Sequence, residues 1–218
     1  MTGHRHDRSK GTTFEEDRVA SVGVGPHPEP WPDDPRLDRT LLAEGDRRNV
    51  IDRYRYWSVE AITEDLDAKR FDFHVAVENW KHDLNIGTVV RNANAFLAKR
   101  VHIVGARRWN RRGAMCTDRY VRIEHHETVD DFAARVSSES LEIVGVDLLP
   151  GAVAIERVKL PRLCVLVFGQ EGEGLSDAMR AKCSTLCAIS QFGSTRSINA
   201  GVASGIAMHW WLSQHAGV

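Results

Sequence analysis

The residues best suited to chemistry lie in three polar stretches, each placed just before or at the start of a predicted helix. The first is Asn85-x-Gly87-x-x-x-Arg91, which puts an amide before a helix and a guanidinium about one turn into it. Gly87 would allow another backbone or a substrate to approach closely. The N-terminus of a helix favours an anionic or oxygen-rich ligand. By itself this spacing also fits a capped helix with an arginine on its surface.

The second stretch is a glycine loop, GQEGEGLS at residues 169–176, which directly follows the apolar segment 165–168. Its glycine spacing is the reverse of the dinucleotide-binding pattern G-x-G-x-x-G, two glutamates would repel a pyrophosphate, and no P-loop Gly-Lys-Ser/Thr follows. A loop with carboxylates suits a neutral or cationic ligand. A sulfonium cofactor with ribose hydroxyls therefore fits better than a nucleoside triphosphate. The simpler interpretation is a tight turn, with Ser176 opening a helix.

The third stretch follows the apolar segment 186–189 and ends in Ser197-Ile198-Asn199, just before a long apolar helix pattern. Ser197 and Asn199 lie where that helix begins, so at least one of them is expected to cap it. Arg196 beside them could reach a phosphate. Two polar loops at the ends of parallel strands would form a ligand crevice in an α/β sheet.

Strands that alternate with helices must position these loops. Apolar runs and periodicity predict strands at 71–77, 101–105, 141–148, 165–168 and 186–189, and helices at about 86–97, 128–137 and 200–212. This alternation implies parallel pairing through βαβ units. The predicted fold class is therefore α/β, with a parallel sheet flanked by helices.

The first 70 residues differ in composition from the rest. Residues 1–34 hold few large apolar side chains, and prolines at alternate positions from 26 to 32 exclude a helix, so we expect a disordered tail. Apolar residues then recur at near-helical spacing, which predicts helices near 36–55 and 58–69, the second capped by Ser58. The expected domains are a tail over 1–34, a helical N-terminal extension over 35–70 and an α/β domain over 71–218.

Basic residues are concentrated in one segment, although the net charge of the chain is only −1. Between Arg91 and Arg122, nine lysines and arginines face one acidic residue, Asp118, which gives +8 over 32 residues. The run Arg107-Arg108-Trp109-Asn110-Arg111-Arg112 adds an aromatic that could stack on a base. An RNA backbone track and a solvated basic loop both fit this pattern.

The cysteines and the apolar segments indicate whether the protein binds a metal and where in the cell it is found. None of the four cysteines forms a CxxC pair, and Cys183-x-x-x-Cys187 lacks a nearby histidine or a second pair, so we expect reduced thiols and no metal site. No apolar run approaches the ~20 residues of a membrane helix. The charged N-terminus has no apolar signal region. We therefore expect a cytoplasmic protein with no membrane segment.

Together the three stretches resemble motifs 1, 2 and 3 of the SpoU (TrmH-like) family of SPOUT RNA 2′-O-ribose methyltransferases. The resemblance rests on Asn85-x-Gly87-x-x-x-Arg91, on LVFGxExxGLS over 166–176 and on Ile189 through Asn199, in the family's order and spacing. It covers roughly residues 70–214. The chain departs from the family pattern at Ser190, where proline is usual, at Ile198, where leucine is usual, and mildly at 200–203.

The resemblance implies a fold, a cofactor and partners. The fold would be a SPOUT-type α/β knot, with a deep trefoil knot near the C-terminus that sequence physics would not predict, since knots are rare. The domain over 71–218 would be an S-adenosyl-L-methionine-dependent methyltransferase acting on a ribose 2′-OH in RNA. The small extension favours tRNA slightly over rRNA, and family members are homodimers. The alternatives are a non-catalytic RNA-binding relative with the same fold and a nucleotide-cofactor enzyme, which would lack its phosphate fingerprint.

The resemblance also assigns roles to residues. It places Arg91, Glu171, Ser197, Asn199 and Asn85 in the catalytic site, where Asn85 would contact the substrate or Glu171. Because arginine stays protonated, we expect Arg91 to orient the hydroxyl and a phosphate and to stabilise the alkoxide. The cofactor contacts would be Leu148, Phe168, Gly169, Gln170, Gly174, Ile189, Gln191, Ser197 and Ile198. The RNA contacts would be Arg91, Arg107, Arg108, Arg111, Arg112 and Arg196.

Overall fold

The computed structural model describes residues 23–80, 85–170 and 172–217. The chain divides into two compact units, Met1–Tyr56 and Trp57–Val218. The strands of the larger unit are β1 His74–Asn79, β2 Val101–Gly105, β3 Ile123–His126, β4 Glu142–Val146, β5 Val153–Ala154, β6 Cys164–Phe168 and β7 Thr185–Ala188. Its α-helices are α2 Val59–Asp67, α3 Ile86–Ala95, α4 Val129–Ser137, α5 Asp177–Lys182 and α6 Ala200–His215.

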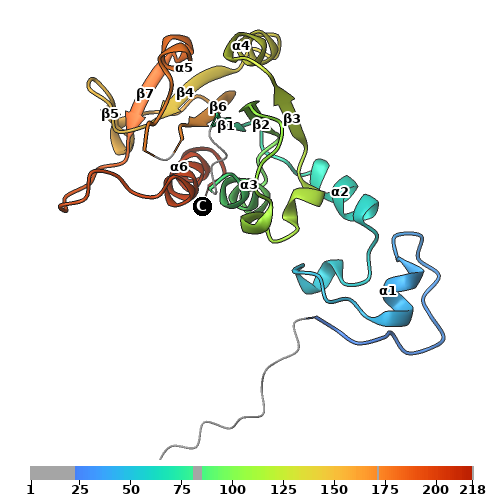
Figure 1. Cartoon of the computed structure of the whole chain (residues 1–218). Helices are drawn as coiled ribbons and strands as arrows, with labels where there is room; N and C mark the ends of the chain where they lie inside the picture. Colours follow the sequence, from blue (N-terminus) through green and yellow to red (C-terminus); the bar gives the residue numbers. More distant parts are fainter. Residues whose placement is uncertain (1–22, 81–84, 171, 218) are drawn as a thin grey trace, which may run out of the picture. The chain divides into compact units, whose positions relative to one another are not determined.

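All seven strands form one parallel sheet in the order β3-β2-β1-β6-β4-β7-β5. Helices α3 and α6 cover one face of it, and α4 and α5 cover the other (Figure 1). Alternate residues of each strand point to opposite faces, so neighbours such as Val75 and Ala76 enter different cores. The predicted parallel α/β sheet flanked by helices is confirmed.

Two strands were not predicted, and both lie at the edges of the sheet. The four residues of β3 contain one large apolar side chain, Ile123, which is 36% exposed, so the sequence shows no apolar run there. The strand β5 has only two residues. The first predicted strand also begins late, at His74, because Phe71 makes only an isolated bridge to Ala98. Ser58 caps α2 as predicted, accepting a hydrogen bond from the Ala61 amide.

Three buried histidines form a row across β1, β2 and β3. His74 Nδ1 lies 2.9 Å from His102 Nε2, and His102 Nδ1 lies 2.8 Å from His126 Nε2. In the described part of the chain, the one group of side chains close enough to hold a metal ion includes two of them, together with Glu124. However, Glu124 already accepts hydrogen bonds from Arg100 at 2.8 Å and from Arg135 at 2.9 Å. We therefore interpret the row as a hydrogen-bonded chain of neutral imidazoles.

This row predicts that the protein loses stability in mild acid. Burial lowers the pKa of His74 to about 4, with smaller lowering effects from Arg100, Lys99 and Arg135, whereas the charge of Glu139 acts in the opposite direction. Burial, with smaller effects from His74 and His126, lowers the pKa of His102 further, to about 2. The unfolded chain, with a histidine pKa of about 6.5, binds more protons than the folded chain between about pH 6.5 and pH 4. Stability therefore falls as the pH drops through that window, by about 2 kcal/mol for each fully buried histidine at about pH 5.

Urea unfolding at about pH 7.5 and pH 5 checks this expectation. A His102→Gln variant retains a polar side chain but titrates one histidine fewer, so its stability should depend less on pH. The pKa values of carboxylates such as Asp46 and Glu139 are lowered in the folded protein, so their contribution to folding stability is lost only below about pH 4.5. They therefore do not add to the change in stability between about pH 7.5 and pH 5. An equal pH dependence in the variant would refute the assignment to this row.

The smaller unit has less helix than predicted, and the expected helix over 36–55 is wrong. Its described residues instead form α1, Arg39–Glu44, and a 3-10 turn at Asp52–Tyr54. Gly45, with φ +93°, ends α1, and the buried Asp46 side chain accepts hydrogen bonds from Arg48 and from the Tyr56 amide at 3.0 Å. These bonds favour a turn there rather than a helix.

The expected tail over 1–34 falls partly outside the described residues, since residues 1–22 are not described. Residues 23–34 belong to the smaller unit, where the Val24 amide donates to the Asp46 carbonyl at 2.9 Å and the His27 amide donates to the Leu42 carbonyl at 2.8 Å. Over the described ranges, no helix combines the length and apolar character needed to cross a membrane. Burial raises the pKa of Cys164 and Cys187 to about 12, so these thiols stay protonated.

Candidate active site

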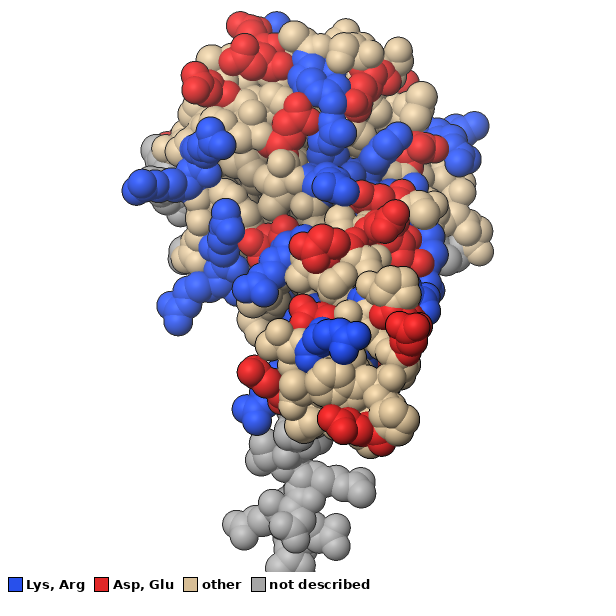
Figure 2. Space-filling view, turned by 90° about the vertical axis from the view of Figure 1, so that its right-hand side faces the viewer, with Lys and Arg blue, Asp and Glu red and all other residues tan. Residues whose placement is uncertain are grey.

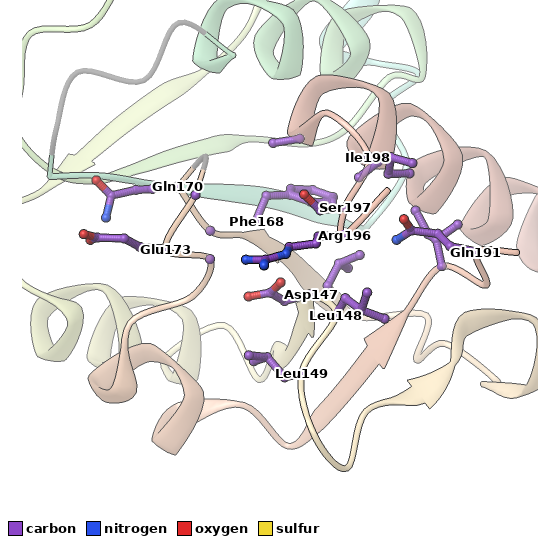
Figure 3. Close-up of a pocket in the computed structure, with 17 residues that line it drawn as sticks. Asp147, Leu148, Leu149, Phe168, Gln170, Glu173, Gln191, Arg196, Ser197 and Ile198 are labelled. Carbon is purple, nitrogen blue, oxygen red and sulfur yellow. The ribbon is translucent and has the colours of Figure 1, made fainter. Parts of the chain in front are cut away.

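A cavity of about 270 Å³ opens at the carboxyl ends of β4, β6 and β7. Side chains of Asp147 and Arg196 extend into the space between the loops, and Glu173 lies at its side (Figure 3). The predicted cofactor contacts all line it: Leu148, Phe168, Gly169, Gln170, Gly174, Ile189, Gln191, Ser197 and Ile198. The structure thus brings these residues together around one cavity, and their role in binding a cofactor stays a prediction.

The glycine loop after β6 folds back on itself and leaves no room for a side chain at Gly169 or Gly174. The Gln170 amide donates to the Gly174 carbonyl at 3.1 Å, and the Gly174 amide donates to the Gln170 carbonyl at 2.9 Å. A Cβ on Gly169 would overlap the carbonyl carbon of Gly174. Gly174 itself has φ +69°, a conformation that glycine adopts easily. Glu171, predicted to be catalytic, lies outside the described residues.

Two carboxylates that sequence reasoning missed hold this loop. Asp147, at the end of β4, accepts a hydrogen bond from the Leu175 amide at 2.8 Å, and a Cβ on Gly174 would overlap its Oδ2. Glu78 in β1 is 1% exposed and accepts hydrogen bonds from the Ser176 amide at 2.8 Å and hydroxyl at 2.7 Å. An acidic residue near the carboxyl end of a predicted strand is the signal that could have identified both.

The first and third motifs meet at the N-termini of α3 and α6. The Asn199 Nδ2 donates to Asn85 Oδ1 at 2.7 Å, and Asn199 also caps α6, accepting from the Val202 amide at 3.2 Å. About two turns further along α3, Asn92 donates to the Gly201 carbonyl at 2.8 Å. Thus the structure confirms Asn199, and not Ser197, as the cap of α6.

Gly87 has the close-approach role that its position predicted. A Cβ there would lie 2.7 Å from the Ala114 backbone nitrogen. A second backbone, the one that follows the arginine-rich segment, therefore packs on the start of α3. The predicted contact between Asn85 and Glu171 involves a residue outside the described part of the chain.

The predicted RNA-binding arginines lie in three places. Arg196 lines the cavity, whereas Arg91 is exposed on α3 and is not among the described residues that line it. The loop after β2 carries the remaining four, Arg107, Arg108, Arg111 and Arg112, and Asn79 fixes this loop at its start. Asn79 does so by donating to the carbonyls of Ala106 at 2.6 Å and Arg108 at 2.9 Å.

Several arginines of the basic segment, Arg111 among them, are engaged in ion pairs. Arg100 pairs with Glu124 at 2.8 Å, and Arg122 pairs with Asp67 at 2.5 Å. Basic and acidic side chains are interspersed on the face shown in Figure 2. Trp109 packs against the core, with the Arg111 guanidinium 5.5 Å from its ring centroid. The candidate RNA-binding surface is therefore smaller than the basic segment between Arg91 and Arg122 suggested.

The fold and the site define a parallel α/β protein with a ligand cleft at the carboxyl ends of its strands. The model of the SpoU rRNA Methylase family matches residues 72–209, which is more than half of the chain. The protein belongs to the SpoU rRNA methylase family. This match covers the sheet, both polar loops and most of α6.

Relatives and solved structures agree with this assignment. The chain is 26% identical over 151 residues to the tRNA (guanosine(18)-2′-O)-methyltransferase of Escherichia coli K12, covering 68% of this chain and 66% of that protein. It is 32% identical over 143 residues to an uncharacterized tRNA/rRNA methyltransferase of Mycolicibacterium smegmatis, covering 62% of this chain and 44% of that protein. The chain therefore spans at most about two thirds of these relatives.

Two crystal structures share the fold. The TrmH/SpoU tRNA modifying enzyme of A. aeolicus has a TM-score of 0.64 at 22% identity, over 73% of this chain and 83% of that one. The SpoU methyltransferase AviRb of Streptomyces viridochromogenes, in complex with the cofactor AdoMet, has a TM-score of 0.62 at 22% identity, over 71% and 65%.

Proposed function

We propose that this protein is an RNA methyltransferase that transfers the methyl group of S-adenosyl-L-methionine to a ribose 2′-OH. The observation that carries the proposal is the cleft itself, in which the glycine loop after β6 and the loop before α6 face each other in a SpoU family chain. The relative from E. coli is named as a tRNA 2′-O-methyltransferase, and the AviRb structure holds AdoMet.

The residues of the cleft fit such a cofactor. Backbone around Gly169 and Gly174 approaches the cavity without intervening side chains, and Leu148, Phe168 and Ile198 offer apolar surface for an adenine ring. The Asp147 carboxylate and the nearby Glu173 suit a positively charged group better than a phosphate. When bound, the cofactor would supply an electrophilic methyl group to the acceptor oxygen.

The protein must then hold the acceptor hydroxyl and stabilise its developing charge. A ribose hydroxyl is a poor nucleophile, so a positioned cation contributes by orientation and by electrostatic stabilisation. We assign this role to Arg91, whose guanidinium can bind a phosphate and a hydroxyl together. Asn85 and Asn199 would shape the site through their 2.7 Å contact, Glu171 would complete it, and Ser197 would fix the loop.

We propose that the enzyme acts as a homodimer. Arg91 does not line the described cavity of its own chain, so a partner would bring it to a second cofactor site. Helix α6 leaves Val202 and Ile206, four residues apart on one side, 55% and 41% exposed, and this apolar strip suits a contact with a second copy. Sedimentation equilibrium tests the proposal, and a protein that stays monomeric at micromolar concentration would rule it out.

We also propose a deep trefoil knot near the C-terminus, a helical extension over 35–70 and a methyltransferase domain over 71–218. The knot is supported by the family membership and by the meeting of two loops with the start of α6 in one cleft. An electron-density trace of this segment decides whether the chain passes through its own loop.

The acceptor would be tRNA or rRNA, with tRNA slightly favoured, and the reaction would take place in the cytoplasm. Arg107 and Arg108 are expected to bind the RNA backbone, so a double alanine variant should reduce the slope of log affinity against log salt by roughly 0.7–0.9 for each phosphate that the variant no longer neutralises. Arg122→Ala is the matched control, because Asp67 already pairs with that arginine. Equal slopes in the double variant and the wild type would remove this loop from the interface.

Incubation with radiolabelled S-adenosyl-L-methionine and separate tRNA and rRNA pools tests the function directly. We expect label in one pool, recovered as a 2′-O-methylnucleoside after nuclease digestion. Binding of RNA without the cofactor, and no label in either pool, would favour a non-catalytic RNA-binding relative instead.

A further inference from the structure

Trp80 is a large exposed aromatic at the edge of the sheet where the candidate active site lies. It directly follows β1, whose carboxyl end is level with those of β6 and β2. Its side chain is 42% exposed, although an indole gains much by burial. No sequence pattern singled it out, because it falls in a polar stretch between a strand and a helix.

The ring is fixed rather than loosely exposed. Its Nε1 donates to the buried Glu78 carboxylate at 2.9 Å, and its backbone amide donates to Gln170 Oε1 at 3.1 Å. Against the ring lies Gly105, with φ +105°, where a Cβ would sit 2.7 Å from the indole Cε3. The backbone at Gly105 therefore supports the ring, and the exposed part of the ring is held in a defined position.

The neighbours of Trp80 link the candidate cofactor cleft with the arginine loop that is proposed to bind RNA. Gln170 belongs to the glycine loop of the cofactor cleft. Asn79, the preceding residue, holds the start of the arginine loop through the carbonyls of Ala106 and Arg108. A fixed aromatic surface between a catalytic cleft and exposed arginines is the arrangement that recognises unpaired bases in RNA.

We propose that Trp80 stacks on an unpaired nucleobase of the RNA substrate, at or beside the nucleotide whose ribose is methylated. This inference rests on the proposed function, and it adds a requirement: the acceptor is presented in a single-stranded or splayed region. Arginines that bind phosphates position RNA without reading its pairing state, whereas a stacking residue requires an accessible base. Trp109 does not have this role, because it packs against the core.

The test measures binding of an oligoadenylate of about 12 nucleotides and of an RNA duplex of the same length, by fluorescence anisotropy. Trp80→Ala should weaken binding of the single strand about tenfold and that of the duplex less than about twofold, with the salt slope unchanged. Trp80→Phe should retain most of the affinity, because it keeps an aromatic face. Circular dichroism and sedimentation confirm that the variants are folded and unchanged in assembly.

Three results would overturn the inference: equal single-strand affinity for Trp80→Ala and the wild type, an equal loss for single strand and duplex, or a change of oligomeric state in the folded variant. The methylation assay separates this from the proposed function. If the wild type methylates RNA, Trp80→Ala should raise the KM for RNA about tenfold and leave cofactor affinity unchanged. If the wild type methylates no RNA, the methyltransferase function is refuted, but the binding experiment still decides whether Trp80 stacks on a base.

Discussion

Arg91→Ala should abolish nearly all methyl transfer while leaving cofactor binding intact. Removal of one group that stabilises developing negative charge typically costs 10²–10³ in rate, so we expect a loss of about a thousandfold in kcat. Cofactor affinity should not change, because Arg91 is exposed on α3 and does not belong to the described lining of the cavity. Single-turnover transfer to RNA and calorimetric titration with S-adenosyl-L-methionine measure the two quantities separately.

Arg91→Lys distinguishes a geometric role from a simple charge. Lysine keeps the positive charge but cannot hold a phosphate and a hydroxyl in one planar fork. We therefore expect Arg91→Lys to stay well below the wild-type rate. Near-full activity in Arg91→Lys would show that a point charge is sufficient, and a parallel loss of cofactor binding in Arg91→Ala would show that Arg91 supports the cleft instead.

A mixed dimer provides a further check of the same residue. If Arg91 serves the partner's cofactor site, a protomer with Arg91→Ala and a protomer with a disabled cofactor loop should together regain one complete site. Activity of the mixture of two inactive proteins, up to about a quarter of wild type by random pairing of protomers, would support sites shared between protomers. No recovery in verified mixed dimers would place Arg91 in the site of its own chain.

The sequence predicted the central strands better than the edges, for a physical reason. Central strands of a parallel sheet are buried on both faces and appear as apolar runs, as in β2 and β6, each of which is fully buried over its length. The edge strand β3 carries Glu124 and His125 and shows no such run. Its pairing with β2 depends on the neighbouring strand and on the histidine row, and neither can be read from four residues alone.

The sequence predicted the site residues that belong to a motif. It missed those that reach the site only because the folded chain brings distant segments together. The predicted cofactor contacts share one cavity because they follow β6, β4 and β7, three neighbouring strands of the sheet. Glu78, Trp80 and Asp147 lie before the motifs with which they interact, and their importance comes from contacts with Gln170, Leu175 and Ser176. Such contacts, between residues 28 to 98 positions apart, depend on strand order.

Gly169→Ala should destroy cofactor binding without unfolding the sheet. The added Cβ would overlap the Gly174 carbonyl carbon and the Leu175 nitrogen, so the loop must move. These atoms belong to the backbone, which cannot rotate away as a side chain could. A displacement of about 1 Å at a binding loop can cost 10²-fold, and we expect cofactor affinity to fall by at least about that factor. Titration calorimetry measures it.

The control for this experiment is Gly193→Ala, in the other loop. A Cβ on Gly193 would meet nothing within 4 Å, so the same added methyl group should leave both affinity and stability almost unchanged. Circular dichroism should show that Gly169→Ala retains its sheet, because β6 ends before residue 169 and its pairings with β1 and β4 are intact. Wild-type cofactor affinity in a folded Gly169→Ala protein would contradict the placement of the cofactor against this loop, since the loop cannot keep its geometry around that methyl group.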